Sequence, residues 1–170
     1  MNATIDSTGN PAGTTSFVGG KFLSFYLSKE EYGMAILKVR EIIGMVDVTP
    51  LPRTPDFVRG VINLRGKIIP VIDLRLKFGM QPAEYTNETC IVVVDVAKDA
   101  ETILQVGCIV DTVCEVLTVD KEQFEPSPRC ANGSGDFVAG LGKLADRVLI
   151  LLDIDKVIGE LSPALAGQVA

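Results

Sequence analysis

The feature that most constrains the fold of this chain is an internal repeat. Residues 60–74 align with residues 140–154, 80 positions further on, and share a glycine, a leucine, a basic residue and an apolar run that ends in aspartate. Residues 33–43 align with residues 107–117, 74 positions further on, through a glycine, a valine, a glutamate and a closing apolar pair. Self-similarity at a nearly constant spacing indicates a duplicated structural unit. We therefore expect two halves with the same fold.

Short apolar segments punctuated by Gly, Pro and Asp run from Lys21 onward, which is typical of β-strands. The predicted strands are 22–27, 34–38, 45–51, 61–64, 68–73, 89–96, 103–110, 115–119 and 148–153. Short helices are predicted at 56–59, 74–78 and 154–160. Asp73 and Asp153 end equivalent apolar runs, so we assign them capping or turn roles, with a functional pair of carboxylates as the alternative.

Units of about 70 to 75 residues with roughly five strands are the size of small barrels, which close on themselves and hide their edges. Each unit would be marginally stable alone, so a shared apolar interface is expected, with a natural binding crevice between the units. We predict an all-β domain over 21–160 with halves at about 21–85 and 86–160, and leave open an exchange of strands between them. Residues 1–20 and 161–170 are predicted to be tails, the first of them flexible.

Composition narrows the range of partners. Apolar residues make up 47% of the chain and charged residues 22%, a balance typical of a globular protein. The net charge of -6 argues against nucleic acid as a partner. Apolar runs of about five residues are too short to span a bilayer, which argues against direct membrane insertion, and no secretory signal is visible. We expect a cytoplasmic protein.

The sequence contains little that points to catalysis. There is no histidine, which removes the commonest general base and excludes the familiar catalytic triads. The four cysteines match no metal-binding spacing and are interpreted as buried reduced thiols: Cys90, Cys108, Cys114 and Cys130. A dinucleotide-type glycine pattern at 140–145 leads into a predicted strand instead of a helix, so we reject it. Neither a metal nor a cofactor is expected.

Arg65 allows two interpretations. It lies between two predicted strands and is followed by Gly66, so a solvated hairpin turn is one of them. Its counterpart in the second half is Ala145, which indicates that the fold does not itself demand a guanidinium there. The other interpretation is that Glu41 holds Arg65 as part of a docking surface, although Glu41 is matched by Glu115 and could be structural.

The stretch 61–74, Val-Ile-Asn-Leu-Arg-Gly-Lys-Ile-Ile-Pro-Val-Ile-Asp-Leu, resembles the CheW family. Further correspondences are 39–42, 51–60, 107–119, 139–142 and 147–153, so the resemblance runs from about 22 to 158. It implies two five-stranded SH3-like barrels and a non-catalytic adaptor, monomeric in isolation and without a cofactor. Family members join methyl-accepting chemoreceptor tips to the regulatory domain of the CheA histidine kinase in membrane-associated arrays.

The resemblance also implies site residues, carried over by position. The receptor-binding set is Arg65, Glu41, Ile62, Leu64 and Gly66, beside a groove that would accept a helical receptor tip. The kinase-binding set is Val39, Ile42, Ile43 and Met45, for which a core role is the alternative. A second surface that builds rings with the kinase is assigned to Phe124 and Phe137.

Two competing interpretations are an enzyme and a fragment of a larger signalling protein. An enzyme would need a base that this sequence does not visibly supply. The fragment would be a CheW-like module normally fused to a receiver or kinase. The start of the chain and a non-helical tail at 162–170 instead favour a stand-alone chain, which is what we expect. Stoichiometric binding of a small molecule would favour the enzyme.

Overall fold

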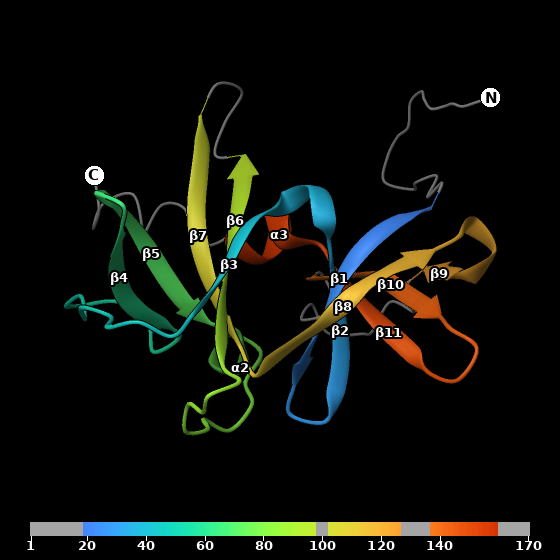
Figure 1. Cartoon of the computed structure of the whole chain (residues 1–170), viewed down its shortest axis with the longest axis horizontal. Helices are drawn as coiled ribbons and strands as arrows, with labels where there is room; N and C mark the ends of the chain where they lie inside the picture. The colour runs from blue at the N-terminus through green and yellow to red at the C-terminus, as the bar shows by residue number, and fades with distance from the viewer. Residues whose placement is uncertain (1–18, 98–101, 127–136, 160–170) are drawn as a thin grey trace.

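A computed structural model describes residues 19–97, 102–126 and 137–159. These residues form two sheets, mostly antiparallel, that lie side by side (Figure 1). The first sheet, called the first barrel, has the order β3 (Val39–Gly44), β6 (Cys90–Ala97), β7 (Ile103–Val110), β5 (Lys67–Asp73) and β4 (Val58–Leu64). The second, called the second barrel, has the order β8 (Thr112–Val119), β1 (Gly20–Leu27), β2 (Glu30–Ala35), β11 (Val148–Leu152), β10 (Val138–Lys143) and β9 (Phe124–Pro126). Short helices α2 (Leu74–Lys77) and α3 (Ile154–Gly159) and the 3-10 turns η1 (Ile36–Lys38) and η2 (Lys121–Gln123) complete the fold. The all-β prediction with a few short helices is confirmed.

The two halves of the chain exchange hairpins. Strands β1 and β2 lie in the second barrel with β10 and β11, whereas β6 and β7 lie in the first barrel with β4 and β5. The exchange is made through two parallel pairings, in which Val71 on β5 faces Gly107 on β7 and Leu151 on β11 faces Gly33 on β2. These are equivalent positions of the repeat, so the duplication in the sequence appears as a pseudo-twofold exchange in the fold.

A similar segment closes each barrel against a glycine. In the first barrel Thr49 forms a single bridge with Val61, and both backbone hydrogen bonds are 2.9 Å long. In the second barrel the corresponding contact is the short strand β9, which pairs with β10 opposite Gly140. A Cβ added at Gly60 or Gly140 would collide with the closing segment, which explains why both positions are glycine. The closing segment forms a strand in the second barrel and only a single bridge in the first, which is why one sheet has six strands where five were expected.

The largest apolar core lies between the barrels. It combines side chains from β1 and β2 with others from β5, β6 and β7 and from both short helices. Its buried members include Phe25, Met34, Leu74, Val94 and Ile158. Each buried aliphatic or aromatic side chain of this kind contributes about 1.5 to 3 kcal/mol relative to exposure. The expected shared interface is confirmed, and smaller cores fill each barrel.

Strand β6 shows why the apolar run at 90–94 is continuous. Ile91 and Val93 point into the core of the first barrel, while Val92, Val94 and Val96 point into the core between the barrels. All five side chains are buried. A strand covered on both faces needs apolar residues at every position, so it lacks the alternation of a half-exposed strand.

An ion pair joins the first turn of each helix to a segment that passes from one barrel to the other. Arg75 on α2 binds Asp111, at the passage from β7 to β8, with an N–O distance of 2.8 Å. Asp155 on α3 binds Lys38, at the passage from β2 to β3, at 2.7 Å. Arg75 and Asp155 are equivalent in the repeat, so the two pairs have opposite polarity. The first pair is the more buried and is therefore less screened by water.

The helix starts agree with the predicted roles of two aspartates. Asp73 caps α2, and its Oδ1 accepts hydrogen bonds from the backbone N–H groups of Arg75 at 2.9 Å and Leu76 at 3.4 Å. The Oδ1 of Asp153 accepts from the N–H of Lys156 at 3.2 Å at the start of α3. These contacts satisfy backbone donors that a helix end leaves free, so the capping prediction is confirmed.

Three predicted elements are wrong in place or type. The strand predicted at 34–38 ends at Ala35 and continues as η1, and the strand predicted at 45–51 lies instead at Val39–Gly44, where it pairs with β6. The helix predicted at 56–59 is a single turn, with the N–H of Val58 bonded to the carbonyl of Pro55, followed by the start of β4. Pairing with β5 across a bulge at 58–60 outweighs the local helical signal. Strands β9 and β10 were not predicted.

The thiols are only partly buried. Cys108 is buried, Cys90 is half-buried and Cys114, on the exposed face of β8, is accessible to solvent. The expectation of a buried thiol is therefore wrong for Cys114. Cys130 lies outside the described residues, as do the predicted tail at 161–170 and residues 1–18 of the tail predicted at 1–20, whose last residue, Gly20, begins β1.

Gly60→Ala is expected to destabilise the chain by more than about 1 kcal/mol, because φ is +140° and a Cβ would clash with the carbonyl of Thr49. Gly44→Ala is the matched control, since a Cβ there meets nothing within 4 Å. The measurement is urea unfolding of both variants. Equal midpoints for the two would show that closure against Gly60 is not required.

Cys114 should react with iodoacetamide well before Cys108 in the folded protein. Burial removes Cys108 from solvent and raises the pKa of its thiol to about 12, so little thiolate forms at pH 8. Peptide mapping by mass spectrometry over a labelling time course gives both rates. Labelling of Cys108 as fast as Cys114 without denaturant would contradict the buried position of β7.

Candidate functional site

The candidate site begins at the β4–β5 hairpin, which presents Arg65 to solvent. Arg65 has φ +54° and Gly66 has φ +85°, the backbone of a two-residue type I′ turn. Strand pairing of Leu64 with Lys67 fixes the register, and the side chain of Asn63 accepts a hydrogen bond of 2.8 Å from the N–H of Gly66. The turn is therefore rigid, and it holds the Arg65 side chain 69% exposed.

Glu41 on β3 holds the Arg65 guanidinium. The two form a hydrogen-bonded ion pair, and Glu41 is the less exposed partner, at 27%. The hydrogen bond to Glu41, followed by the charge of Glu41, raises the pKa of Arg65 above its ordinary value. The pair fixes the direction of a guanidinium that remains open to solvent on its other side.

A pocket of about 220 Å³ lies beside this pair, at the end of the first barrel. Arg40, Glu41, Arg65 and Lys67 are among its lining residues, and Leu64, Ile69 and Val93 supply its apolar surface. Ile69 and Val93 belong to the buried core of the barrel, with Leu64 packed against it. The pocket combines an apolar floor with charged groups at its rim, an arrangement suited to a side chain from another protein.

The predicted receptor-binding set is only partly brought together. Arg65, Glu41 and Leu64 line the pocket, and Gly66 forms the adjoining turn. Ile62 is 2% exposed and lies within the core of the first barrel. A contact between Ile62 and a partner would need rearrangement of that core, so its visible role is packing.

The predicted kinase-binding stretch divides by face. Ile42 is 42% exposed, whereas Ile43 and Met45 are half-buried against the core of the first barrel. Val39 is half-buried against the core between the barrels. Of these four side chains, Ile42 is the one that a partner could reach most readily.

The aromatic residues assigned to a second surface both take part in packing. The Phe124 ring packs against the core of the second barrel and lies over Gly140, where a Cβ would be 2.5 Å from it. Phe137 contacts Phe78 with a centroid distance of 5.9 Å, and the ammonium of Lys77 lies 4.6 Å from its centroid. Both aromatic side chains are half-buried, which leaves part of each accessible.

The second barrel carries its own arginine at the equivalent hairpin. Arg147, two positions after Ala145, binds Glu31 at 2.6 Å, Asp146 at 3.0 Å and Glu115 at 3.4 Å. The position equivalent to Arg65 is still Ala145, but Arg147, which matches Lys67, places a guanidinium at the same hairpin. The match of Glu115 with Glu41, and of Arg147 with Lys67, was the signal that could have identified this pair in the sequence.

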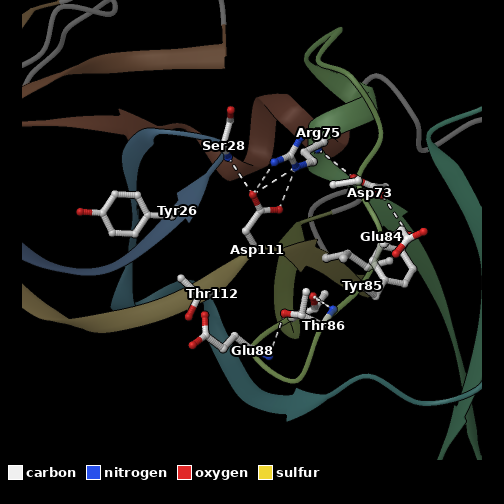
Figure 2. Close-up of a pocket in the computed structure, with 13 residues that line it drawn as sticks. Tyr26, Ser28, Asp73, Arg75, Glu84, Tyr85, Thr86, Glu88, Asp111 and Thr112 are labelled. Atoms are coloured by element: carbon white, nitrogen blue, oxygen red, sulfur yellow. Dashed lines mark hydrogen bonds and ion pairs between the residues drawn. The ribbon is translucent and has the colours of Figure 1, made fainter.

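A second pocket, of about 350 Å³, lies in the expected crevice between the barrels (Figure 2). Arg75 and the N–H of Ser28 both donate to Asp111, and the hydroxyl of Tyr85 donates to Asp73 at 3.0 Å. Burial would raise the pKa of Asp111, but hydrogen bonds from Arg75 and Ser28 and the charge of Arg75 lower it. Burial and Asp73 raise the pKa of Tyr85 to about 12. These polar groups satisfy one another and tie the barrels together.

The described residues contain no cluster of three or more side chains suited to a metal ion. Within the same part of the chain, no helix has the length and apolar character needed to cross a bilayer. The polar groups in the crevice pair with each other, whereas the pocket beside Arg65 opens to solvent with charged groups at its rim.

Known proteins resemble this chain along most of its length. The family model described as a CheW-like domain matches residues 21–162. The chemotaxis protein CheW of Klebsiella aerogenes is 44% identical over 154 residues, covering 90% of each chain, and that of Rhizobium meliloti is 34% identical over 140 residues, covering 82% of this chain and 87% of the relative.

A solved structure is also similar. The crystal structure of the scaffolding protein TtCheW from Thermoanaerobacter tengcongensis has a TM-score of 0.74 and 35% identity, covering 83% of this chain and 93% of the other. This likeness confirms the predicted fold of two SH3-like subdomains. A family model that spans most of the chain, relatives that match along nearly their whole length and a shared fold lead to one conclusion: the chain belongs to the CheW family of chemotaxis scaffold proteins.

Proposed function

We propose that this chain is a non-catalytic adaptor that couples the cytoplasmic tips of methyl-accepting chemoreceptors to the regulatory domain of the CheA histidine kinase. The observation that carries the proposal is the exposed Arg65–Glu41 pair beside a pocket with an apolar floor, at the positions that match the family's motif. A receptor tip is a helical hairpin, and a helix binds through apolar contacts bordered by polar ones. The protein would act in the cytoplasm, as a monomer until it is recruited to receptor arrays.

The two partners would use different faces of the first barrel. The receptor is assigned to the Arg65 end, and the kinase regulatory domain to the β3 edge, where Ile42 is the exposed apolar side chain. Phe124 and Phe137 are assigned to a second kinase-binding surface, on the second barrel. Spatial separation of the sites is what an adaptor needs, because both partners must bind at the same time.

Arg65→Ala should weaken binding to a soluble chemoreceptor cytoplasmic fragment by roughly five- to tenfold, because an anchoring guanidinium is lost. The thermal midpoint should move by no more than about 3 °C, because an ion pair this exposed adds little stability. Affinity for the CheA regulatory domain should stay unchanged. Titration calorimetry with each partner, with calorimetric melting as the folding control, measures all three.

A collapse of the melting midpoint would show that Arg65 is structural. Arg147→Ala is the matched control, because it removes the equivalent guanidinium of the second barrel. If Arg147→Ala reduced receptor affinity as much as Arg65→Ala, the receptor site would not be confined to the first barrel.

Glu41→Ala should reduce receptor affinity through Arg65, because Glu41 directs the guanidinium. The loss in the Arg65→Ala/Glu41→Ala double variant should therefore be smaller than the product of the two single losses. The same calorimetric titration, run on all four proteins of the cycle, tests this. Losses that multiply fully would mean that the two side chains act independently on the receptor.

A further inference from the structure

The pocket beside Arg65 has a positively charged rim on an acidic protein. Arg40, Arg65 and Lys67 line it and are all exposed, while Glu41 and Asp95 are the carboxylates that pair with this set. Cations therefore outnumber carboxylates here, although the whole chain carries a net charge of -6. Local charge of the opposite sign to the molecule indicates a surface that attracts anionic groups.

The equivalent end of the second barrel has the opposite balance. Arg147 is surrounded by Glu31, Glu115 and Asp146, and Lys143 pairs with Glu125 at 3.1 Å. Both barrels have an equivalent hairpin and an equivalent closing segment, so the fold does not require a cationic rim. The difference lies in the side chains alone.

The cationic side chains of the pocket beside Arg65 also have hydrogen-bond donors that the described residues leave unused. Within the described residues, Arg65 bonds to Glu41 alone, and Lys67 has no ion-pair partner. By contrast, Arg147 contacts three carboxylates, and Arg75 binds both oxygens of Asp111 and the carbonyl of Gln81. A guanidinium offers five N–H groups, so Arg65 can hold Glu41 and still bind an incoming carboxylate.

The apolar residues that line the pocket favour an incoming side chain with an aliphatic stem. Leu64 and Ile69 form an apolar floor below Arg65 and Lys67, so an aliphatic stem can rest on the floor while its end reaches the rim. We propose that this pocket binds a glutamate side chain carried by the receptor tip, with its carboxylate between Arg65 and Lys67. The inference rests on the proposed receptor-binding function and adds the chemistry of the contact and a new contributing residue, Lys67.

The test is calorimetric titration with a soluble chemoreceptor cytoplasmic fragment at about 50 mM and about 300 mM NaCl. Lys67→Gln should lower affinity about two- to fivefold at low salt and much less at high salt. Lys143→Gln, at the equivalent end of the second barrel, is the matched control and should leave affinity unchanged. Replacing the tip glutamates of the fragment by glutamine, one at a time, should identify one that causes the same loss as Lys67→Gln.

Combining that receptor change with Lys67→Gln should cause no further loss, and a Lys67→Glu variant should regain binding to a fragment carrying lysine at that glutamate. Wild-type affinity that is unaffected by Lys67→Gln and by every tip substitution would overturn the glutamate contact while leaving receptor binding in place. No binding of the wild-type chain to the receptor fragment under either condition would overturn the proposed function itself.

Discussion

The structure depends on the exchange of hairpins that creates one apolar core between the barrels. Each barrel is completed by two strands from the other half of the chain, joined through the parallel pairs at Gly33 and Gly107. A Cβ at Gly107 would lie 2.7 Å from Ile91, and one at Gly33 would lie 3.0 Å from Leu149, so a side chain at either crossing would force a buried neighbour to shift. Neither half can bury its apolar surface alone, which makes the two barrels one cooperative unit and holds the binding ends in fixed relation.

The repeat made the two-barrel architecture predictable, but not the way in which the strands are shared. Capping by Asp73 and Asp153 followed from their positions after apolar runs, and both aspartates do cap helices. Strand β10 escaped prediction because Gly140 and Gly142 interrupt its apolar pattern, although these glycines are what let Phe124 and Val119 pack closely over it. The exchange of hairpins leaves no local signal, because strands β2 and β7 would have the same pattern beside either neighbour.

Part of the candidate site could be predicted, from the family motif and from a comparison of the two halves of the repeat. Arg65 and Glu41 were found from their motif, and the structure brings them together. Ile62 and Ile43 were assigned to partner binding with them but pack in or against the core of the first barrel, because a motif does not say which of its apolar residues are buried. Duplication gives both barrels an arginine at the hairpin, and function is expected where the surroundings of the two differ: Arg147 is enclosed by carboxylates, whereas Arg65 is open.

We propose that this chain transmits receptor state to a kinase without chemistry of its own. The most direct measurement is CheA autophosphorylation in a reconstituted mixture of receptor-bearing membranes, kinase and this chain, with the chain titrated from zero. Kinase activity should come under receptor control only when the chain is present, and the effect should saturate at a fixed ratio of chain to kinase. Receptor-controlled activity of equal size in the absence of the chain, or no effect at any concentration, would contradict it.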